Sequence, residues 1–228
     1  MKNLPIVTKS LLVANIALWL LTVLLQRSGV PLVSILGLFN YHSPYFHWWQ
    51  PLTYMFMHSN FSHLFFNMFA VLMFGPVLER EWGTWKYLIY YIICGLGAAF
   101  TQEVVWSLMG TDVAVTIGAS GAVFGILLAF GWFFPDVPMF IIFIPIPIRA
   151  RIFVIIYAVI ELFAGIANIS GDNVAHFAHL GGMLFGLILL VFWRYGSNWH
   201  LPRIFKRHGV DSTKDKDYSD YHYHRKIE

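Results

Sequence analysis

Six apolar stretches run along the chain, and polar or proline-rich segments separate them. A helix that crosses a bilayer needs about 20 predominantly apolar residues, because each residue adds about 1.5 Å of length. We expect membrane-spanning helices at residues 11–25, 63–78, 85–108, 113–134, 152–167 and 174–193. The pattern therefore predicts an all-α membrane protein, built as a bundle of six transmembrane helices.

The composition agrees with this class, since 58% of the residues are hydrophobic and only 12% are charged. A soluble domain carries about 25% charged residues. The net charge of +3 is small, and the basic residues lie at the edges of the apolar stretches, which favours a membrane surface over a nucleic acid. With six spans, every Lys and Arg except Arg27 falls on the side that holds the termini. Because basic residues favour the cytoplasmic side, we expect both termini there, in a multi-pass protein of the cell membrane.

Three other segments differ from the spans in composition. Residues 29–62 are rich in aromatic side chains, which favour the membrane interface, so we expect an external loop in the outer leaflet. Residues 135–148 contain four prolines, and this density excludes a helix. We divide the chain into an N-terminal segment with the first span (1–44), a core (45–195) and a charged cytoplasmic tail (196–228), which we expect to be disordered.

Polar groups inside the spans concentrate near the starts of the second, fourth and sixth stretches. These groups are His63 and Asn67, then Ser120, then His176 and His179. The three stretches run in the same direction through the membrane, so the groups share a depth of about 5–10 Å below the outer surface. Polar side chains at such depth are costly and usually functional. The pattern therefore predicts a site that faces the exterior.

A serine and a histidine are the candidate reactive groups. Ser120 lies in the run 118–121, Gly-Ala-Ser-Gly, and a serine hydroxyl needs an adjacent base before it can act as a nucleophile. The imidazole of His179 suits that role. Small residues let two helices approach closely, and glycines recur one turn apart in both spans. These glycines are Gly121 and Gly125 in the fourth span and Gly182 and Gly186 in the sixth.

Supporting groups complete the predicted site. His63 and Asn67 are four residues apart and share a helix face, where both can donate hydrogen bonds to an oxyanion beside Ser120. Free N–H groups near a helix start can assist. Glu161, placed near mid-membrane, is expected to form a tertiary pair. We expect no acidic residue beside His179, and hence a dyad without a third member.

These motifs resemble the rhomboid intramembrane serine proteases. The resemblance rests on Gly118–Gly121, on His63-x-x-x-Asn67 and on the run Ala-His-Leu-Gly-Gly-x-x-x-Gly at 178–186, and it extends over 45–193. It implies a six-helix rhomboid-like bundle with Ser120 and His179 as catalytic dyad. It also implies oxyanion support from His63, Asn67 and the Ser120 backbone. The implied substrates are single-span membrane proteins, cut near the outer face.

The chain departs from the family pattern at two positions. Gln50 follows Trp49 where family members often have arginine, and Phe124 stands where many have a tyrosine that stacks on the catalytic histidine. The phenyl ring keeps the stacking surface. We therefore include Phe124 among the supporting residues, together with Gly118 and His176.

Other interpretations of the polar layer remain open. An inactive rhomboid-like protein that escorts membrane helices would lack one member of the dyad, and a small-solute transporter would show inverted repeats. His176 and His179 could bind a metal, but with no Cys, Asp or Glu expected at their depth we predict neither metal nor cofactor. The expected partners are substrate helices and the lipid bilayer, and His58 is expected to be structural.

Overall fold

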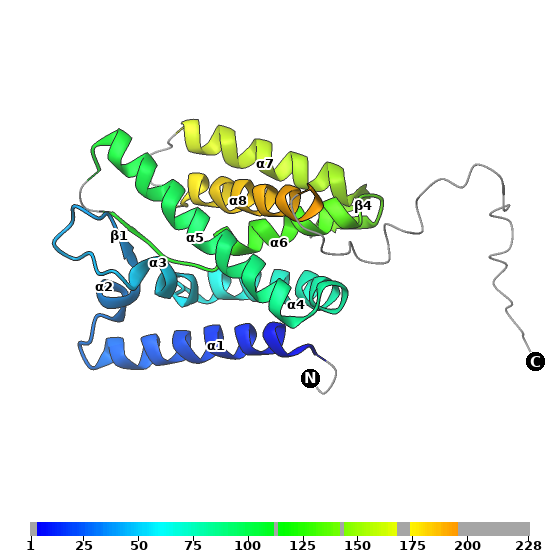
Figure 1. The fold of residues 1–228 in the computed structure, drawn as a ribbon. Helices are drawn as coiled ribbons and strands as arrows, with labels where there is room; N and C mark the ends of the chain where they lie inside the picture. Colours follow the sequence, from blue (N-terminus) through cyan, green and yellow to red (C-terminus); the bar gives the residue numbers. More distant parts are fainter. Residues whose placement is uncertain (1–3, 112–113, 142–143, 168–173, 196–228) are drawn as a thin grey trace, which may run out of the picture. The chain divides into compact units, whose positions relative to one another are not determined.

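The computed structural model of the protein describes residues 4–111, 114–141, 144–167 and 174–195. Within these residues the protein is mostly helical (Figure 1). The long helices are α1 (Ile6–Arg27), α4 (Phe61–Trp82), α5 (Thr84–Met109), α6 (Ser120–Phe133), α7 (Ala150–Ala167) and α8 (His176–Tyr195). All of these but α6 are long and apolar enough to cross a membrane, whereas α6 has 14 residues.

The fourth predicted span is wrong at its start. Helix α6 begins at Ser120 and not near residue 113, because β2 (Val115–Thr116) pairs antiparallel with β1 (Leu38–Phe39). The β-branched side chains before residue 118 favour an extended backbone, which hydropathy alone does not distinguish from a helix. Ser120 is therefore the first residue of its helix, with an extended segment leading to it.

The central helices α5, α6 and α8 pack against one another (Figure 1). Glycines allow this packing, since a Cβ on Gly125 would overlap the Cys94 side chain on α5. Buried tyrosines fill the space between the helices, among them Tyr87, Tyr90 and Tyr91 on α5. Tyr90 donates a hydrogen bond to the Gly125 carbonyl oxygen over 2.9 Å. These contacts hold α5 close to α6.

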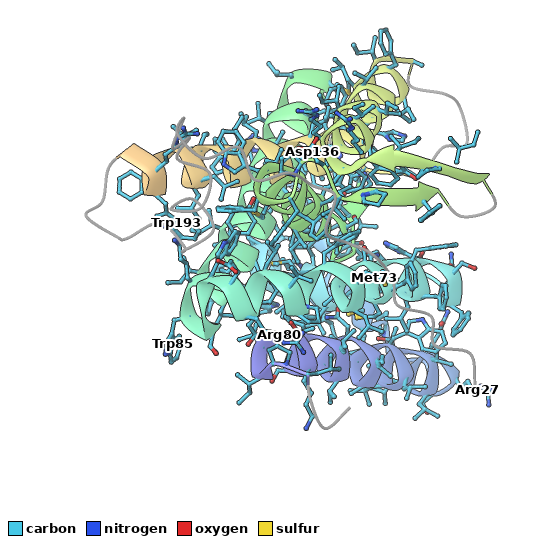
Figure 2. The ribbon with its side chains drawn as sticks, turned by 90° about the vertical axis from the view of Figure 1, so that its right-hand side faces the viewer. Arg27, Met73, Arg80, Trp85, Asp136 and Trp193 are labelled. Atoms are coloured by element: carbon cyan, nitrogen blue, oxygen red, sulfur yellow. The ribbon has the colours of Figure 1, made fainter. Side chains whose placement is uncertain are left out.

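Helix α1 packs antiparallel to α4, as the contact of Trp19 with Phe61 at one end indicates. At the other end the buried Glu79 carboxylate accepts hydrogen bonds from the backbone N–H groups of Val7 (2.9 Å) and Thr8 (2.7 Å). A helix start has unpaired N–H groups and a positive dipole end, so Glu79 caps α1 and fixes it to α4. Figure 2 shows Arg27 at the opposite end of α1, away from Trp85.

The segments between the helices follow the sequence analysis in part. No helix forms in the described part of 135–148, as the prolines predict, and β3 (Pro138–Ile141) pairs there with β4 (Ile144–Arg149). This hairpin was not predicted. At the open end of the hairpin, Asp136 forms ion pairs with two arginines. It lies 3.1 Å from the Arg151 guanidinium and 3.6 Å from the Arg149 guanidinium. The predicted disordered tail lies outside the described residues.

The loop before α4 contains α2 (Leu32–Leu36), β1, α3 (Gln50–Thr53) and a 3₁₀ turn η1 (Tyr54–Phe56). Gln50 organises it from a fully buried position, with 0% of its surface exposed. Its Nε2 donates to the Tyr45 carbonyl (2.9 Å) and its Oε1 accepts from the Phe39 N–H (3.3 Å). The glutamine is therefore a structural link within the loop, while Trp48 nearby is 82% exposed.

Candidate active site

Ser120 and His179 face one another across the α6–α8 contact. Ser120 Oγ lies 2.7 Å from His179 Nε2, within hydrogen-bond distance. The two backbones come close because neither helix has a side chain at the crossing, since a Cβ on Gly182 would overlap the Gly121 carbonyl group. The structure thus brings together the serine and the histidine that the sequence singled out, by means of the glycines that the sequence singled out.

The turn before Ser120 is shaped by Gly118, whose φ of +135° suits glycine. Its N–H donates to the Tyr54 carbonyl over 2.9 Å, which ties the turn to the 3₁₀ element. A Cβ at Gly118 would lie 2.7 Å from His63 Nε2 and 3.5 Å from Ser120 Oγ. Gly118 therefore lies between the serine hydroxyl and the His63 ring, where there is no room for a side chain.

His63 is oriented toward this turn, whereas Asn67 is not shown to reach it. The backbone N–H of His63 bonds to the capping side chain of Asn60 (2.8 Å), and its Nδ1 lies 3.2 Å from Ser59 Oγ. Its Nε2 is thereby directed at Gly118. The buried Asn67 donates from Nδ2 to the His63 carbonyl over 3.0 Å, so that hydrogen bond lies within α4.

The expectation that no acidic residue lies beside His179 is wrong. Glu161 Oε2 lies 2.8 Å from His179 Nδ1 and 2.7 Å from His176 Nδ1, and the glutamate is only 8% exposed. The predicted tertiary pairing of Glu161 is present, and its partners are these histidines. The sequence analysis placed Glu161 too far from the histidines: it lies about 9 Å from the C-terminal end of α7, and α8 starts at His176.

Phe124 packs flat on His179, with ring centroids 4.4 Å apart and planes within 10°. The stacking that the sequence predicted for this ring is present without a phenolic hydroxyl. The imidazole therefore contacts Ser120 and Glu161 through its edge and Phe124 through its face.

The acidic residue also removes the reason for expecting no metal. The donor atoms of Glu161, His176 and His179 lie within 4.8 Å of one another, and zinc accepts these ligand types. Both histidine nitrogens, however, approach the same carboxylate oxygen at 2.7–2.8 Å, which are hydrogen-bond distances. The geometry described here is that of two imidazoles sharing one acceptor.

His58 packs edge to face on the ring of His63, with ring centroids 4.9 Å apart. Burial, together with the neighbouring His63, lowers the pKa of His58 to about 4. The ring is therefore neutral near pH 7. The structural role expected for this residue agrees with its buried position.

This pKa gives an expected pH dependence of stability. Between the ordinary pKa of histidine near 6.5 and the lowered value near 4, the unfolded chain binds a proton at His58 that the folded chain does not. Stability therefore falls as pH drops through that window, by up to about 3 kcal/mol at roughly 1.4 kcal/mol per pKa unit. The measurement is the drop in Tm between pH 7.5 and pH 4.5 in detergent. We expect a smaller drop for His58→Phe than for the wild type and for His42→Phe, a control at an exposed histidine. An equal loss in all three proteins would contradict this assignment.

Comparison with known proteins identifies the family. The Rhomboid domain model matches residues 45–196, which is more than half of the chain. The chain is 29% identical to Rhomboid-like protein 11, chloroplastic, of Arabidopsis thaliana over 193 residues, 79% of this chain and 62% of that protein. It is 31% identical to Rhomboid protease AarA of Providencia stuartii over 159 residues, 63% and 55% of the two chains.

A third relative, Putative rhomboid protease YdcA of Bacillus subtilis, is 29% identical over 146 residues, 62% of this chain and 65% of that one. The chain spans less than two thirds of the length of each of these relatives. Other relatives include RHOMBOID-like protein 6, mitochondrial, of Arabidopsis thaliana, so the family is not confined to one membrane. The domain match and the apolar helices together make this chain a multi-pass membrane protein of the rhomboid family.

Proposed function

We propose that this protein is an intramembrane serine endopeptidase that cuts peptide bonds in or next to transmembrane helices. The observation that carries the proposal is the 2.7 Å contact between Ser120 Oγ and His179 Nε2 at the start of α6. A serine hydroxyl within hydrogen-bond distance of an imidazole nitrogen has the adjacent base that it needs to act as a nucleophile. Its position between apolar helices directs that chemistry at other membrane proteins.

The reaction has two steps. His179 Nε2 takes the proton of Ser120 as Oγ attacks the scissile carbonyl carbon, and the resulting imidazolium gives that proton to the leaving amine as the C–N bond breaks. The acyl group is then joined to Ser120 through an ester. Water, deprotonated by His179, attacks the ester, and Ser120 recovers its proton as the carboxylic acid product leaves.

The negative oxygen formed in each step needs hydrogen-bond donors. The start of α6 has no side-chain cap, and the first N–H groups of a helix have no acceptor within it, so the backbone from Ser120 onward supplies donors. His63, on the far side of Gly118, supplies another through Nε2. Asn67 holds the His63 backbone and acts in this scheme through that residue.

Membrane placement follows from the same residues. We propose that α6 completes a six-span bundle with both termini cytoplasmic, in the cell membrane. The starts of α4, α6 and α8 then lie toward the exterior, and the site receives water from that face. Single-span membrane proteins are the proposed substrates, since a lone helix can approach the bundle laterally.

Substrate choice should depend on helix strength. The backbone of a membrane helix is already hydrogen-bonded, so a segment must unwind before its carbonyl reaches Ser120. We expect a single-span reporter with Gly or Pro near the outer face to be cleaved at least ~10-fold faster than a poly-Leu reporter in liposomes, because each Gly or Pro weakens a helix by about 1–3 kcal/mol. Equal rates for the two reporters would refute the unwinding requirement.

A protein that only escorts membrane helices is the alternative, since several relatives are named rhomboid-like and not protease. The liposome assay separates the two. Reporter cleavage that requires Ser120 supports the protease, whereas reporter binding without any cleavage or serine reactivity supports the escort.

A further inference from the structure

We propose that Glu161 is a positioning residue for His179, so that the site works as a serine–histidine–glutamate relay, with His176 holding the glutamate. The inference rests on the proposed proteolytic function and names a third member for its site. It arises from one carboxylate oxygen, Glu161 Oε2, which both histidines approach through Nδ1 at 2.7 and 2.8 Å.

The contact selects a histidine tautomer. An ionised carboxylate oxygen can only accept hydrogen bonds, so His179 must carry its proton on Nδ1 to bond with Glu161. The lone pair on Nε2 is then free to accept the Ser120 proton over 2.7 Å. With the proton on Nε2 instead, His179 would donate to the serine and could not act as its base.

The contact also fixes the orientation of the ring. Phe124 lies parallel to the imidazole and defines its plane, but a flat stack permits rotation within that plane. Glu161 removes this freedom by holding Nδ1, which keeps Nε2 directed at Ser120. His176, one turn before His179 on α8, holds the same oxygen from a second direction.

The charge of Glu161 has a further effect during the reaction. His179 becomes an imidazolium when it takes the proton, and a carboxylate at 2.8 Å stabilises that cation. The carboxylate is 8% exposed, and electrostatic attraction is stronger away from water. The contact between α7 and α8 therefore serves the chemistry. It also serves the packing, because Gly165 on α7 leaves room for the Phe177 ring of α8.

The test compares reporter cleavage in liposomes by wild type, Glu161→Gln, His176→Gln and the double variant. Glutamine keeps the size of Glu161 and removes its charge. We expect Glu161→Gln to lower kcat by about 10²- to 10⁴-fold, as loss of the corresponding carboxylate does in soluble serine proteases, with KM changed less than about threefold. His176→Gln should lower kcat less than Glu161→Gln does. The double variant should have the same kcat as Glu161→Gln, because His176 acts through the glutamate.

The split between kcat, KM and Tm separates positioning from a merely structural role. A carboxylate that holds the imidazole at 2.8 Å acts on the chemical step, so Glu161→Gln should lose kcat while KM and Tm stay near those of the wild type. A structural role would instead lower Tm and raise KM together with the loss of kcat.

The outcome is separable from the proposed function. Ser120→Ala must be inactive for the proteolytic proposal to stand. If it is, and Glu161→Gln retains wild-type kcat, the relay is excluded while the protease survives. Activity of the wild type that is lost on EDTA treatment and restored by zinc would also overturn the relay, since the three side chains would then be metal ligands.

Discussion

Replacing Ser120 or His179 with alanine should lower the rate of reporter cleavage by about 10⁴-fold or more, the largest effect expected anywhere in the chain. Ser120→Ala removes the only atom that can form the acyl intermediate in this mechanism. His179→Ala leaves the serine hydroxyl in place but removes the base that lies 2.7 Å from its oxygen. Because the two groups act as a unit, the double variant should be no slower than either single variant.

The assay is cleavage of a single-span reporter in liposomes, quantified by product release. Ser28→Ala, an exposed serine at the C-terminal end of α1, is the matched control and should retain wild-type activity. Melting temperatures within a few degrees of wild type would show that the lost activity is chemical. Cleavage by Ser120→Ala within tenfold of wild type would remove Ser120 as the nucleophile.

Gly182→Ala should have the largest effect expected outside the side chains of the site itself, on both stability and activity. The added methyl group would overlap the carbonyl of Gly121 on α6, and backbone cannot rotate away as a side chain can. Overpacking of this kind costs about 1–3 kcal/mol or more. Separating α6 from α8 by even about 1 Å would also break the serine–histidine contact, with a rate loss of roughly 10²-fold.

Gly186→Ala, one turn further along α8, is the comparison. There the added methyl would meet the hydroxyl of Tyr90 at 2.5 Å and Cys94 Sγ at 3.1 Å, both on side chains that can shift. We expect a smaller loss of Tm and activity within about tenfold of wild type. Should Gly182→Ala fail to fold, its poor yield beside a folded Gly186→Ala still supports the close crossing. Wild-type Tm and activity for Gly182→Ala would contradict it.

Hydrophobic pattern predicted the helices because lipid-facing and core positions are both apolar. Helix α7 was placed within two residues at its start and correctly at its end, and α5 within one residue at each end. The start of α6 was misplaced because residues 115–117 are apolar, and an apolar run can form either a strand or a helix. Only their pairing with Leu38–Phe39, far away in the chain, decides that they are extended.

The candidate site was predictable where spacing along single helices determines it. The glycine pairs, one turn apart on α6 and on α8, follow from helix geometry alone. The depth of Ser120 did not, because it was counted from a helix expected to begin at residue 113, and α6 begins at Ser120. Glu161 could not be placed in the same way, because its contact with His179 depends on how α7 is rotated about its own axis. One signal was available: Glu161 is the only acidic residue in the fifth apolar stretch, and a lone buried carboxylate needs partners.

The most direct test of the account is to label the purified protein with a fluorophosphonate, which phosphorylates activated serines, and to map the adduct by mass spectrometry. We expect one adduct, on Ser120, in the wild type and none in Ser120→Ala or His179→Ala. An adduct on another serine, or labelling that persists without the His179 imidazole, would contradict the claim that these two side chains form the reactive site.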